Sequence, residues 1–185
     1  MVDGPICPIL CYPPRNVTMN PPQFSPSNYE SPFNLFLRGI EEPPVESRRG
    51  DVVYESEEVL GVICSRQIAG HEGHSLVISK KQYASILDLP TAIGQEVFAV
   101  TQIVSRAMLQ AFGCDGITIL QNNGQASDQT VFHYHVHVIP RWKDDNFLVL
   151  YASHTDTQRL MPALRRAELA GILRVEVERQ IGDNN

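Results

Sequence analysis

The chain has 185 residues, of which 43% are hydrophobic and 19% charged, and its formal net charge is −6 at pH 7. This length fits one domain with a modest extension, and the composition is sufficient for a globular core. The negative charge argues against nucleic-acid binding, which normally requires a basic face, but a small anionic ligand can still be bound locally. No apolar run approaches the roughly 20 residues of a membrane span, so no membrane partner is expected.

The first fifty residues differ in composition from the rest of the chain. They hold ten of the thirteen prolines, which block helices and sheet interiors. We expect residues 1–50 to form a Pro-rich N-terminal extension, in which 1–30 has no fold of its own. The N-terminus lacks the basic start and continuous apolar stretch of a signal peptide. Cys7 and Cys11 are spaced too widely for a CxxC pair, so reduced thiols in a cytoplasmic protein are the expectation.

Regular structure is predicted from Asp51 onward. Val52–Ser56 and Val59–Cys64 read as a β-hairpin, and Ser75–Ile78 as a third strand. Tyr83–Leu89 begins a helical stretch, and Pro90 fits the start of the next helix. The apolar residues of Ile93–Phe112 recur at helical spacing, and Gly113 is a suitable end for that helix.

The second half of the chain supplies two more strands and a helix. Gly116–Leu120 is the fourth strand, Gln121–Gln129 a polar loop, and Val131–Pro140 the fifth strand. A helix is expected near Thr157–Glu178, with these residues on its buried side: Leu160, Leu164, Leu169, Ile172 and Leu173. The fold class is therefore α+β, a mostly antiparallel five-stranded sheet with one long helix and a shorter one, plus an N-terminal tail and a C-terminal helix.

Three alternating histidines are the strongest functional signal in the chain. His133, His135 and His137 share one face of a strand, because successive side chains of a strand point to opposite faces. Neighbouring histidines then lie about 6.6 Å apart, which suits a row of groups along one extended anionic substrate. Imidazoles titrate near neutrality and serve as nucleophiles, acids and bases.

Two other interpretations of this row stay open from the residues alone. Imidazoles on one strand face can converge on zinc, copper or nickel. A histidine can also be purely structural if its polar atoms are satisfied. The surrounding residues have to decide between these alternatives.

The chain resembles the histidine triad (HIT) family, whose signature is His-φ-His-φ-His-φφ with φ an apolar residue. All seven positions of 133–139 match, and Pro140-Arg141 follow as in the family. The resemblance extends to Asn122-Asn123-Gly124, Gln129-Thr130 and the Gly-His-x-Leu-Val-Ile segment at 73–78. It covers about 51–142, roughly half of the chain.

The resemblance implies a role for each histidine. His135 is the expected nucleophile that attacks the α-phosphorus and carries the nucleotidyl group, and the backbone carbonyl of His133 holds its other ring proton. His137 is expected to contact the phosphate or the bridging atom of the leaving group and to help protonate it. His74 matches a fourth histidine near the triad. The related branch with transferase activity carries Gln at the place of His137, so hydrolysis is favoured.

Further substrate contacts are implied at three polar positions. Asn122, Gln129 and Thr130 match residues that contact phosphate and leaving group, where positioned donors stabilise the charge of the transferring phosphoryl group. The resemblance implies no cofactor and no metal for this chemistry.

The chain departs from the family at several positions. Ser31 and Asn34 stand where many bacterial relatives carry a zinc-binding CxxC, so we predict no structural zinc. Arg66 stands where relatives often place Asp or Asn to hold the ribose hydroxyls, and a cation cannot accept those hydrogen bonds. Either the ribose is held differently or the ligand has an extra anionic group for Arg66; a solvated arginine is the alternative. Asp128 replaces a glycine and is expected to point to solvent, and His71 is expected on a loop surface.

These observations predict a HIT catalytic domain at 51–142, the N-terminal extension 1–50, and a C-terminal extension with a helix at 143–185. The expected enzyme releases a nucleoside monophosphate from a phosphoramidate, a dinucleoside polyphosphate or another nucleotidyl conjugate, through a covalent bond to His135. A purine nucleotide or its conjugate is the expected ligand, and a homodimer is expected through the long helix. The alternative is a nucleotide-binding or scaffold protein with vestigial catalysis, which the departures at Arg66 and Asp128 motivate.

Overall fold

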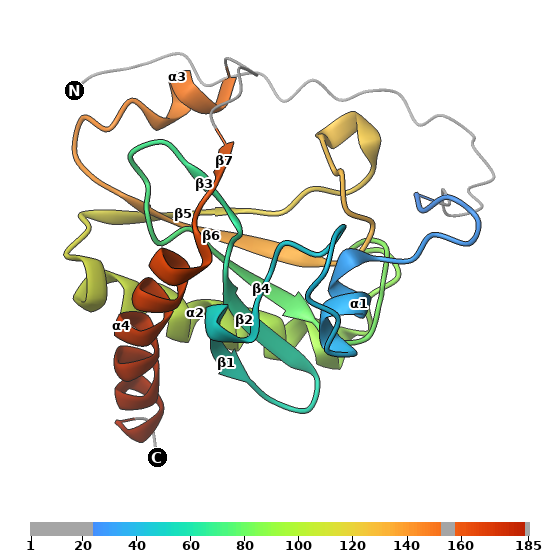
Figure 1. Cartoon of the computed structure of the whole chain (residues 1–185), viewed down its shortest axis with the longest axis horizontal. Helices are drawn as coiled ribbons and strands as arrows, with labels where there is room; N and C mark the ends of the chain where they lie inside the picture. The colour runs from blue at the N-terminus through green and yellow to red at the C-terminus, as the bar shows by residue number, and fades with distance from the viewer. Residues whose placement is uncertain (1–23, 153–157, 184–185) are drawn as a thin grey trace, which may run out of the picture.

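The computed structural model describes residues 24–152 and 158–183. Its centre is an antiparallel sheet of five strands in the order β1-β2-β4-β6-β5 (Figure 1). These strands are β1 (Val52–Glu55), β2 (Val59–Ile63), β4 (Ser75–Ser79), β5 (Gly116–Leu120) and β6 (His135–Arg141). A second, two-stranded sheet pairs β3 (Arg66–Ile68) with β7 (Gln158–Leu160). The predicted α+β class and the five-stranded antiparallel sheet are confirmed.

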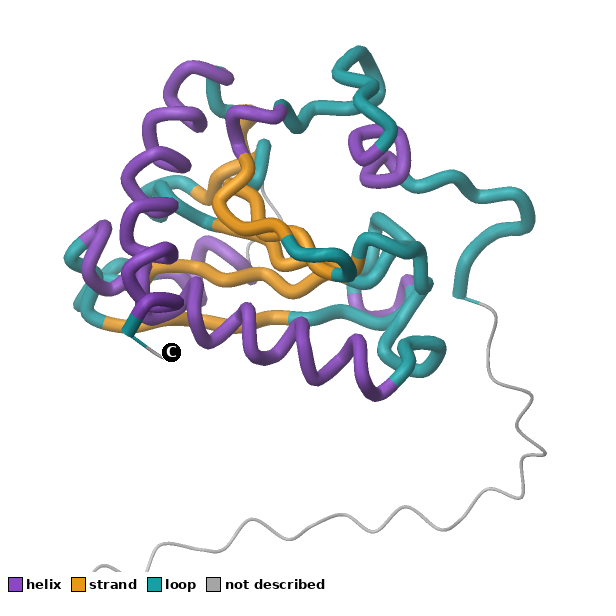
Figure 2. The backbone as a smooth tube through the Cα atoms, turned by 90° about the horizontal axis from the view of Figure 1, so that it is seen from below, coloured by secondary structure: helices purple, strands orange, loops and turns teal. Residues whose placement is uncertain are grey.

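Two long helices cover one face of the sheet (Figures 1 and 2). They are α2 (Thr91–Phe112) and α4 (Ala163–Gly182). Their apolar sides meet alternate residues of the strands, and the largest buried cluster of the described chain forms between them, including Val59, Val77, Val104, Met108, Val136 and Leu173. Burial of this apolar surface is the main stabilising contribution to the fold.

The opposite face of the sheet is covered by the segment that precedes β1. The short helix α1 (Pro32–Leu37) begins at Ser31, whose side-chain oxygen accepts a hydrogen bond from the Phe33 backbone N–H. Phe33, Phe36 and Val45 then pack on Leu60, Val62, Leu76 and Ile78 of β2 and β4. Part of the Pro-rich stretch is therefore integral to the core, while residues 1–23, which include Cys7 and Cys11, lie outside the described residues.

Local sequence signals explain the best-predicted elements. The hairpin of β1 and β2 and the strands β4 and β5 lie where their β-rich runs predict them. Pro90 stands at the N-cap of α2, and Gly113 ends that helix in the left-handed conformation with φ 60°. These features are confirmed because each depends only on neighbouring residues.

Three predicted elements need correction. Tyr83–Leu89 forms turns rather than a helix, because the Ser85 hydroxyl bonds the Leu87 N–H and the Asp88 carboxylate and so competes with helical hydrogen bonds. Strand β6 begins at His135, not at Val131. The C-terminal helix begins at Ala163, after Pro162, and the residues just before it form β7.

The buried side of α4 is also only partly as predicted. Leu169 and Leu173 are buried, but Leu164 is 76% exposed and Ile172 is 48% exposed. Leu160 lies in β7 and is exposed as well. The buried face instead includes Arg166, Ala170 and Val177, and Arg166 has buried acceptors in Asp51 and the Glu46 carbonyl.

The remaining elements were not predicted from the sequence. Besides α1, β3 and β7, they are α3 (Phe147–Ala152) and the 3₁₀ turns η1 (Arg49–Asp51) and η2 (Gln125–Ser127). All are six residues or shorter, which is too short for a periodic pattern to emerge. None of the described helices is long and apolar enough to cross a membrane.

Candidate active site

The two sides of β6 face different environments. Tyr134, Val136 and Val138 point into the core beneath α2, while His135 and His137 line a cavity of about 230 Å³ on the opposite face. The alternation expected of a strand therefore holds for these residues. The imidazole centroids of His135 and His137 lie 4.9 Å apart, so both can reach one bound group.

His133 lies before β6 and is fully buried, so the prediction that all three histidines sit on one strand is wrong in this detail. Its Nε2 is 2.5 Å from the Ser79 carbonyl oxygen, which fixes the ring away from the cavity lining. Its own carbonyl oxygen lies 2.6 Å from Nδ1 of His135. A carbonyl only accepts, so His135 Nδ1 carries the proton and Nε2 carries the lone pair.

A fourth histidine contacts the third one of the row. His74 is buried at the start of β4, and its Nε2 is 2.9 Å from Nδ1 of His137. Gly73, the residue before His74, packs closely against α2. Its φ is +104°, and a Cβ there would stand 2.5 Å from the ring of Phe112. The position of His74 thus depends on close contact between the β3–β4 turn and the long helix.

All four imidazoles are held neutral by their surroundings. Burial lowers the pKa of His74 and of His133 to about 4. Burial also lowers the pKa of His135, against the opposing effect of its hydrogen bond to the His133 carbonyl. For His137 burial and the neighbouring imidazoles of His74 and His135 bring the pKa well below its ordinary value. A neutral imidazole is the form that attacks phosphorus.

The polar residues of the loop between β5 and β6 differ in whether they reach the cavity. Thr130 lines the cavity together with His135 and His137. Gln129 is buried, and its amide is engaged with the backbone: Oε1 accepts from Gly124 N–H, and Nε2 donates to two carbonyls. Asn122 is half-buried and does not line the cavity. Asp128 is exposed, as expected.

Several residues from the segment before β1 line the cavity without having been predicted, among them Phe33 and Glu46. Phe33 of α1 presents its ring edge-on to His133 and His135, with centroid distances of 5.5 Å in both cases. Glu46 forms a two-point ion pair with Arg66 of β3, at 2.6 and 3.1 Å, and both line the cavity. No local pattern marks them, because each is brought to the histidines only by the tertiary fold.

Comparison with known proteins is consistent with this geometry. A HIT domain model matches residues 46–144, which is more than half of the chain. The chain belongs to the histidine triad family. Relatives include "Protein hit" of Bacillus subtilis, 35% identical over 56% of this chain and 71% of that protein.

One further sequence relative and one solved structure show how much of the chain is similar to known HIT proteins. Adenylylsulfatase HINT3 of Arabidopsis thaliana is 32% identical over 50% of this chain, which spans about half (46%) of that longer protein. The crystal structure of a zinc-bound histidine triad protein from Mycobacterium smegmatis matches with a TM-score of 0.64 at 28% identity. That match covers 82% of this chain and 95% of the other, so the HIT fold is shown.

The residues at the CxxC position do not fit a zinc ion in this HIT protein. Ser31 caps α1, and the Asn34 side-chain amide donates to Gln82 Oε1 at 2.5 Å. Neither side chain supplies a thiolate or imidazole, the usual structural zinc ligands. Within residues 24–152 and 158–183, no group of three or more His, Cys, Asp and Glu is arranged to hold a metal. Cys64 and Cys114 are buried free thiols.

His71 is not on the surface, contrary to the prediction. It is 1% exposed, and its Nε2 lies 3.0 Å from Asp145 Oδ2. Asp145 also accepts a two-point pair from Arg141, which holds the pKa of its carboxyl far below the usual range. His71 is buried because it joins the β3–β4 turn to the end of β6, a contact that sequence spacing does not reveal.

Proposed function

We propose that this HIT protein is a hydrolase that forms a covalent nucleotidyl-histidine at His135 and then transfers the nucleoside monophosphate to water. One observation carries the proposal: His135 Nδ1 is bonded to the His133 carbonyl, which leaves the Nε2 lone pair for attack inside the cavity. The lowered pKa values keep this lone pair available at neutral pH.

The reaction has two displacements at phosphorus. In the first, the bond from His135 Nε2 to the α-phosphorus forms while the bond to the leaving group breaks. In the second, water attacks the phosphorus and passes a proton to His137, which replaces the one that His137 gives to the leaving group, and the N–P bond breaks to restore the neutral imidazole of His135. His137 lies beside His135 and is the expected proton donor to the leaving group, with His74 bonded behind it as a positioning residue.

The other polar residues are proposed in narrower roles. Thr130 lines the cavity and can donate its hydroxyl to a phosphate oxygen. Gln129 holds the loop that carries Thr130, through its bonds to Gly124, Ala84 and Val131. Direct contact of Asn122 or Gln129 with a ligand stays a prediction. For such a contact Gln129 would have to give up its backbone partners, and Asn122 would have to move toward the cavity.

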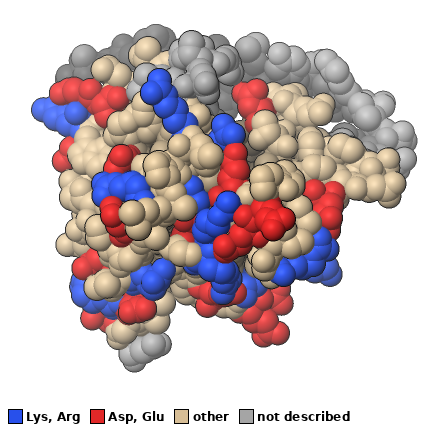
Figure 3. All heavy atoms as spheres, in the orientation of Figure 1, with Lys and Arg blue, Asp and Glu red and all other residues tan. Residues whose placement is uncertain are grey.

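The proposed substrates are purine nucleotidyl conjugates: phosphoramidates, dinucleoside polyphosphates or related mixed anhydrides. The name of the Arabidopsis relative, an adenylylsulfatase, is one example of this class of bond, although only half of that protein is matched. A nucleic-acid ligand is not proposed, since acidic and basic side chains alternate over the face seen in Figure 3.

We also propose a homodimer formed by α2 and β5. Strand β5 is at the edge of the sheet, with backbone groups open to pairing. Beside it, Ile86, Phe98 and Ile119 are more than half exposed around an apolar hollow between α2 and the strands. A second copy of the chain would bury this surface and extend the sheet.

The proposal also includes the domain bounds and the cellular setting. Residues 51–142 are taken as the catalytic part, flanked by extensions at 1–50 and 143–185, in a cytoplasmic setting where the buried thiols stay reduced.

A parallel substrate assay tests the proposed function. Adenosine and guanosine phosphoramidates, adenylylsulfate and dinucleoside polyphosphates are incubated with the wild-type chain and with His135→Asn, with and without chelator. We expect turnover of at least one member by the wild type, unaffected by chelator, and none by the variant. Binding of nucleotides without any turnover would contradict the proposal and favour a nucleotide-binding protein.

A further inference from the structure

Among the described residues that line the cavity, one is a carboxylate, and it is oriented by hydrogen bonds. Glu46 accepts hydrogen bonds from Arg66 at both of its oxygens and from the Ser65 hydroxyl at Oε2, 3.0 Å away. A carboxylate offers about four lone-pair positions, so these three bonds leave roughly one position, at Oε1. The hydrogen bonds from Arg66 also lower the pKa of Glu46, which is ionised at neutral pH.

An ionised carboxylate selects which part of a ligand can lie against it. It repels phosphate oxygens, and it accepts but cannot donate hydrogen bonds. The group that meets Glu46 must therefore be a hydrogen-bond donor without negative charge, some distance from the phosphorus. In a nucleoside monophosphate the sugar hydroxyls are such donors, attached close to the phosphate that His135 would attack.

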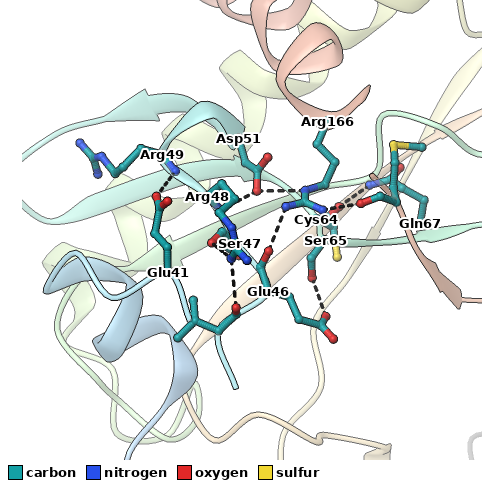
Figure 4. A network of polar contacts seen from close by, with 12 residues as sticks. Glu41, Glu46, Ser47, Arg48, Arg49, Asp51, Cys64, Ser65, Gln67 and Arg166 are labelled. Carbon is teal, nitrogen blue, oxygen red and sulfur yellow. Dashed lines mark hydrogen bonds and ion pairs between the residues drawn. The ribbon is translucent and has the colours of Figure 1, made fainter. Parts of the chain in front are cut away.

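The backbone of Glu46 is held by the C-terminal helix. Arg166 of α4 is 2% exposed, and its guanidinium donates to the Glu46 carbonyl at 2.9 Å and to Asp51 Oδ2 at 3.0 Å (Figure 4). It also donates to the Met161 carbonyl. Asp51 in turn accepts from the Arg48 N–H at 2.7 Å. One buried side chain thus joins the helix, the segment at Glu46 and the start of β1.

This arrangement reaches beyond the matched HIT domain. That domain ends at residue 144, whereas Arg166 lies twenty-two residues further along the chain. Strand β7 adds to the same connection, because it pairs with β3, the strand that carries Arg66. Gln158 of β7 lines the cavity as well. The C-terminal segment is therefore placed to support the wall of the cavity that Glu46 and Arg66 form.

We propose that Glu46 is the acceptor for a sugar hydroxyl of the substrate, and that Arg166 is the positioning residue that holds it in place. This inference rests on the proposed nucleotide chemistry and assigns the part of the ligand that this wall recognises. Arg66 then orients the carboxylate rather than binding an additional anionic group of the ligand.

Binding measurements on Glu46→Ala test the first half of this proposal. The probes are AMP, 2′-deoxy-AMP, 3′-deoxy-AMP and IMP, titrated calorimetrically into the wild-type chain and the variant. A hydrogen bond to a carboxylate corresponds to about a tenfold change in Kd. We expect the wild type to prefer AMP over at least one deoxy analogue by about tenfold, and the variant to show no preference.

Equal Kd values for AMP and both deoxy analogues in the wild type would overturn the assignment. A loss of discrimination between AMP and IMP in the variant, with ribose discrimination kept, would also overturn it, because Glu46 would then recognise the base. These readouts need no turnover. A covalent adduct at His135 that forms while ribose discrimination is absent would leave the proposed function intact and refute only this inference.

Arg166 is tested in a background that avoids an unpaired buried charge. Arg166→Met alone would leave Asp51 uncompensated, so the variant is Asp51→Asn/Arg166→Met, with folding checked by circular dichroism. We expect it to lose ribose discrimination as Glu46→Ala does, with no further loss when the two changes are combined. Arg174→Gln is the matched control, because Arg174 lies on the same helix but donates to the Val52 carbonyl.

Rescue distinguishes positioning from a general effect on the fold. Arg166→Lys retains a cation for Asp51 and a donor for one carbonyl, and we expect it to recover part of the discrimination. Full ribose discrimination in the folded Asp51→Asn/Arg166→Met protein would refute the role of Arg166. Losses of AMP affinity that add up in the combination with Glu46→Ala would refute it as well.

Discussion

The two faces of strand β6 differ in every respect that matters for function. On one face, Val136 and Val138 join a core made largely of α2 and neighbouring strands, beside an apolar hollow. On the other, His135 and His137 line a cavity whose wall comes from distant segments, such as α1 and residue 46. A single alternating run of residues therefore serves stability on one side and chemistry on the other.

This difference shows how burial acts on the two sides. On the core face burial contributes stability through apolar contact. On the cavity face burial lowers the pKa of each histidine, which costs stability at acidic pH but keeps the imidazoles neutral. Substitutions on the two faces should therefore separate turnover from folding.

The largest expected effect is that of His135→Ala. Removing the nucleophile should lower kcat by at least about 10³-fold, because His135 is the proposed carrier of the nucleotidyl group. The free energy of unfolding should change little, since the ring faces a cavity rather than the core. Steady-state turnover and urea unfolding of the same preparation measure both quantities.

Val136→Ala, one residue away on the opposite face, is the matched control. It should lower the free energy of unfolding by about 1.5–3 kcal/mol through lost burial while leaving kcat within a few-fold of the wild type. If Val136→Ala impaired turnover as strongly as His135→Ala, the division between the two faces would be wrong.

Gly73 lies between the core helix α2 and the active-site residue His74, so its replacement should affect both stability and turnover. In Gly73→Ala the new methyl group would overlap the Phe112 ring, and its φ of +104° is unfavourable for alanine. We expect a loss of about 2–4 kcal/mol in the free energy of unfolding and reduced turnover, since His74 follows directly.

Gly113→Ala provides the comparison for backbone strain alone. Its φ is +60°, but no atom lies within 4 Å of the added carbon, so a loss of about 1 kcal/mol is expected with normal turnover. Equal losses in the two variants would show that contact with α2 is not what demands glycine at position 73.

The apolar hollow beside β5 should respond to a charge. Phe98→Glu places a carboxylate on the surface proposed to meet a second copy, and should weaken dimerisation by about 10- to 100-fold. Leu164→Glu, at a similarly exposed site on α4, should not. Sedimentation equilibrium of the three proteins decides the matter, and a monomeric wild type would contradict the proposed homodimer.

The pH dependence of activity is the smallest effect. With an ordinary imidazole pKa of about 6.5, kcat/KM would drop about fourfold between pH 7.5 and 6. Because burial lowers the pKa of His135, we expect a smaller change than this fourfold one. An acid limb with its midpoint at 6.5 or above would show that burial does not control this group.

Stability should show the complementary pH dependence. The imidazoles of His74 and His133 take up protons near pH 6.5 in the unfolded chain but only near 4 in the folded one. The unfolded state then binds more protons between these values, so the free energy of unfolding falls as pH drops from 6.5 toward 4. Urea unfolding at several pH values measures this slope.

The sequence reveals the core face of the molecule better than the cavity face. Strand alternation and helical spacing are local properties, so β1, β2, β4, β5 and α2 are predictable from neighbouring residues. The same alternation places His135 and His137 together. The prediction fails where side chains compete with the backbone, as Ser85 does in the turn before α2.

The cavity wall depends on contacts between residues far apart in the chain. Glu46 meets Arg66 across 20 positions, and Arg166 meets Asp51 across 115. A polar residue on the buried side of α4 could have signalled such a contact, but its partner could not have been named from sequence. The buried state of His71, which depends on Asp145, was missed for the same reason.

The central claim is that Nε2 of His135 takes the nucleotidyl group covalently. Mass spectrometry of the chain after brief incubation with an adenosine phosphoramidate and a quench without acid tests it directly. We predict a mass increase of one adenylyl group on the peptide that contains His135, lost in His135→Asn. An adduct on another residue, or rapid turnover without any adduct, would contradict the account.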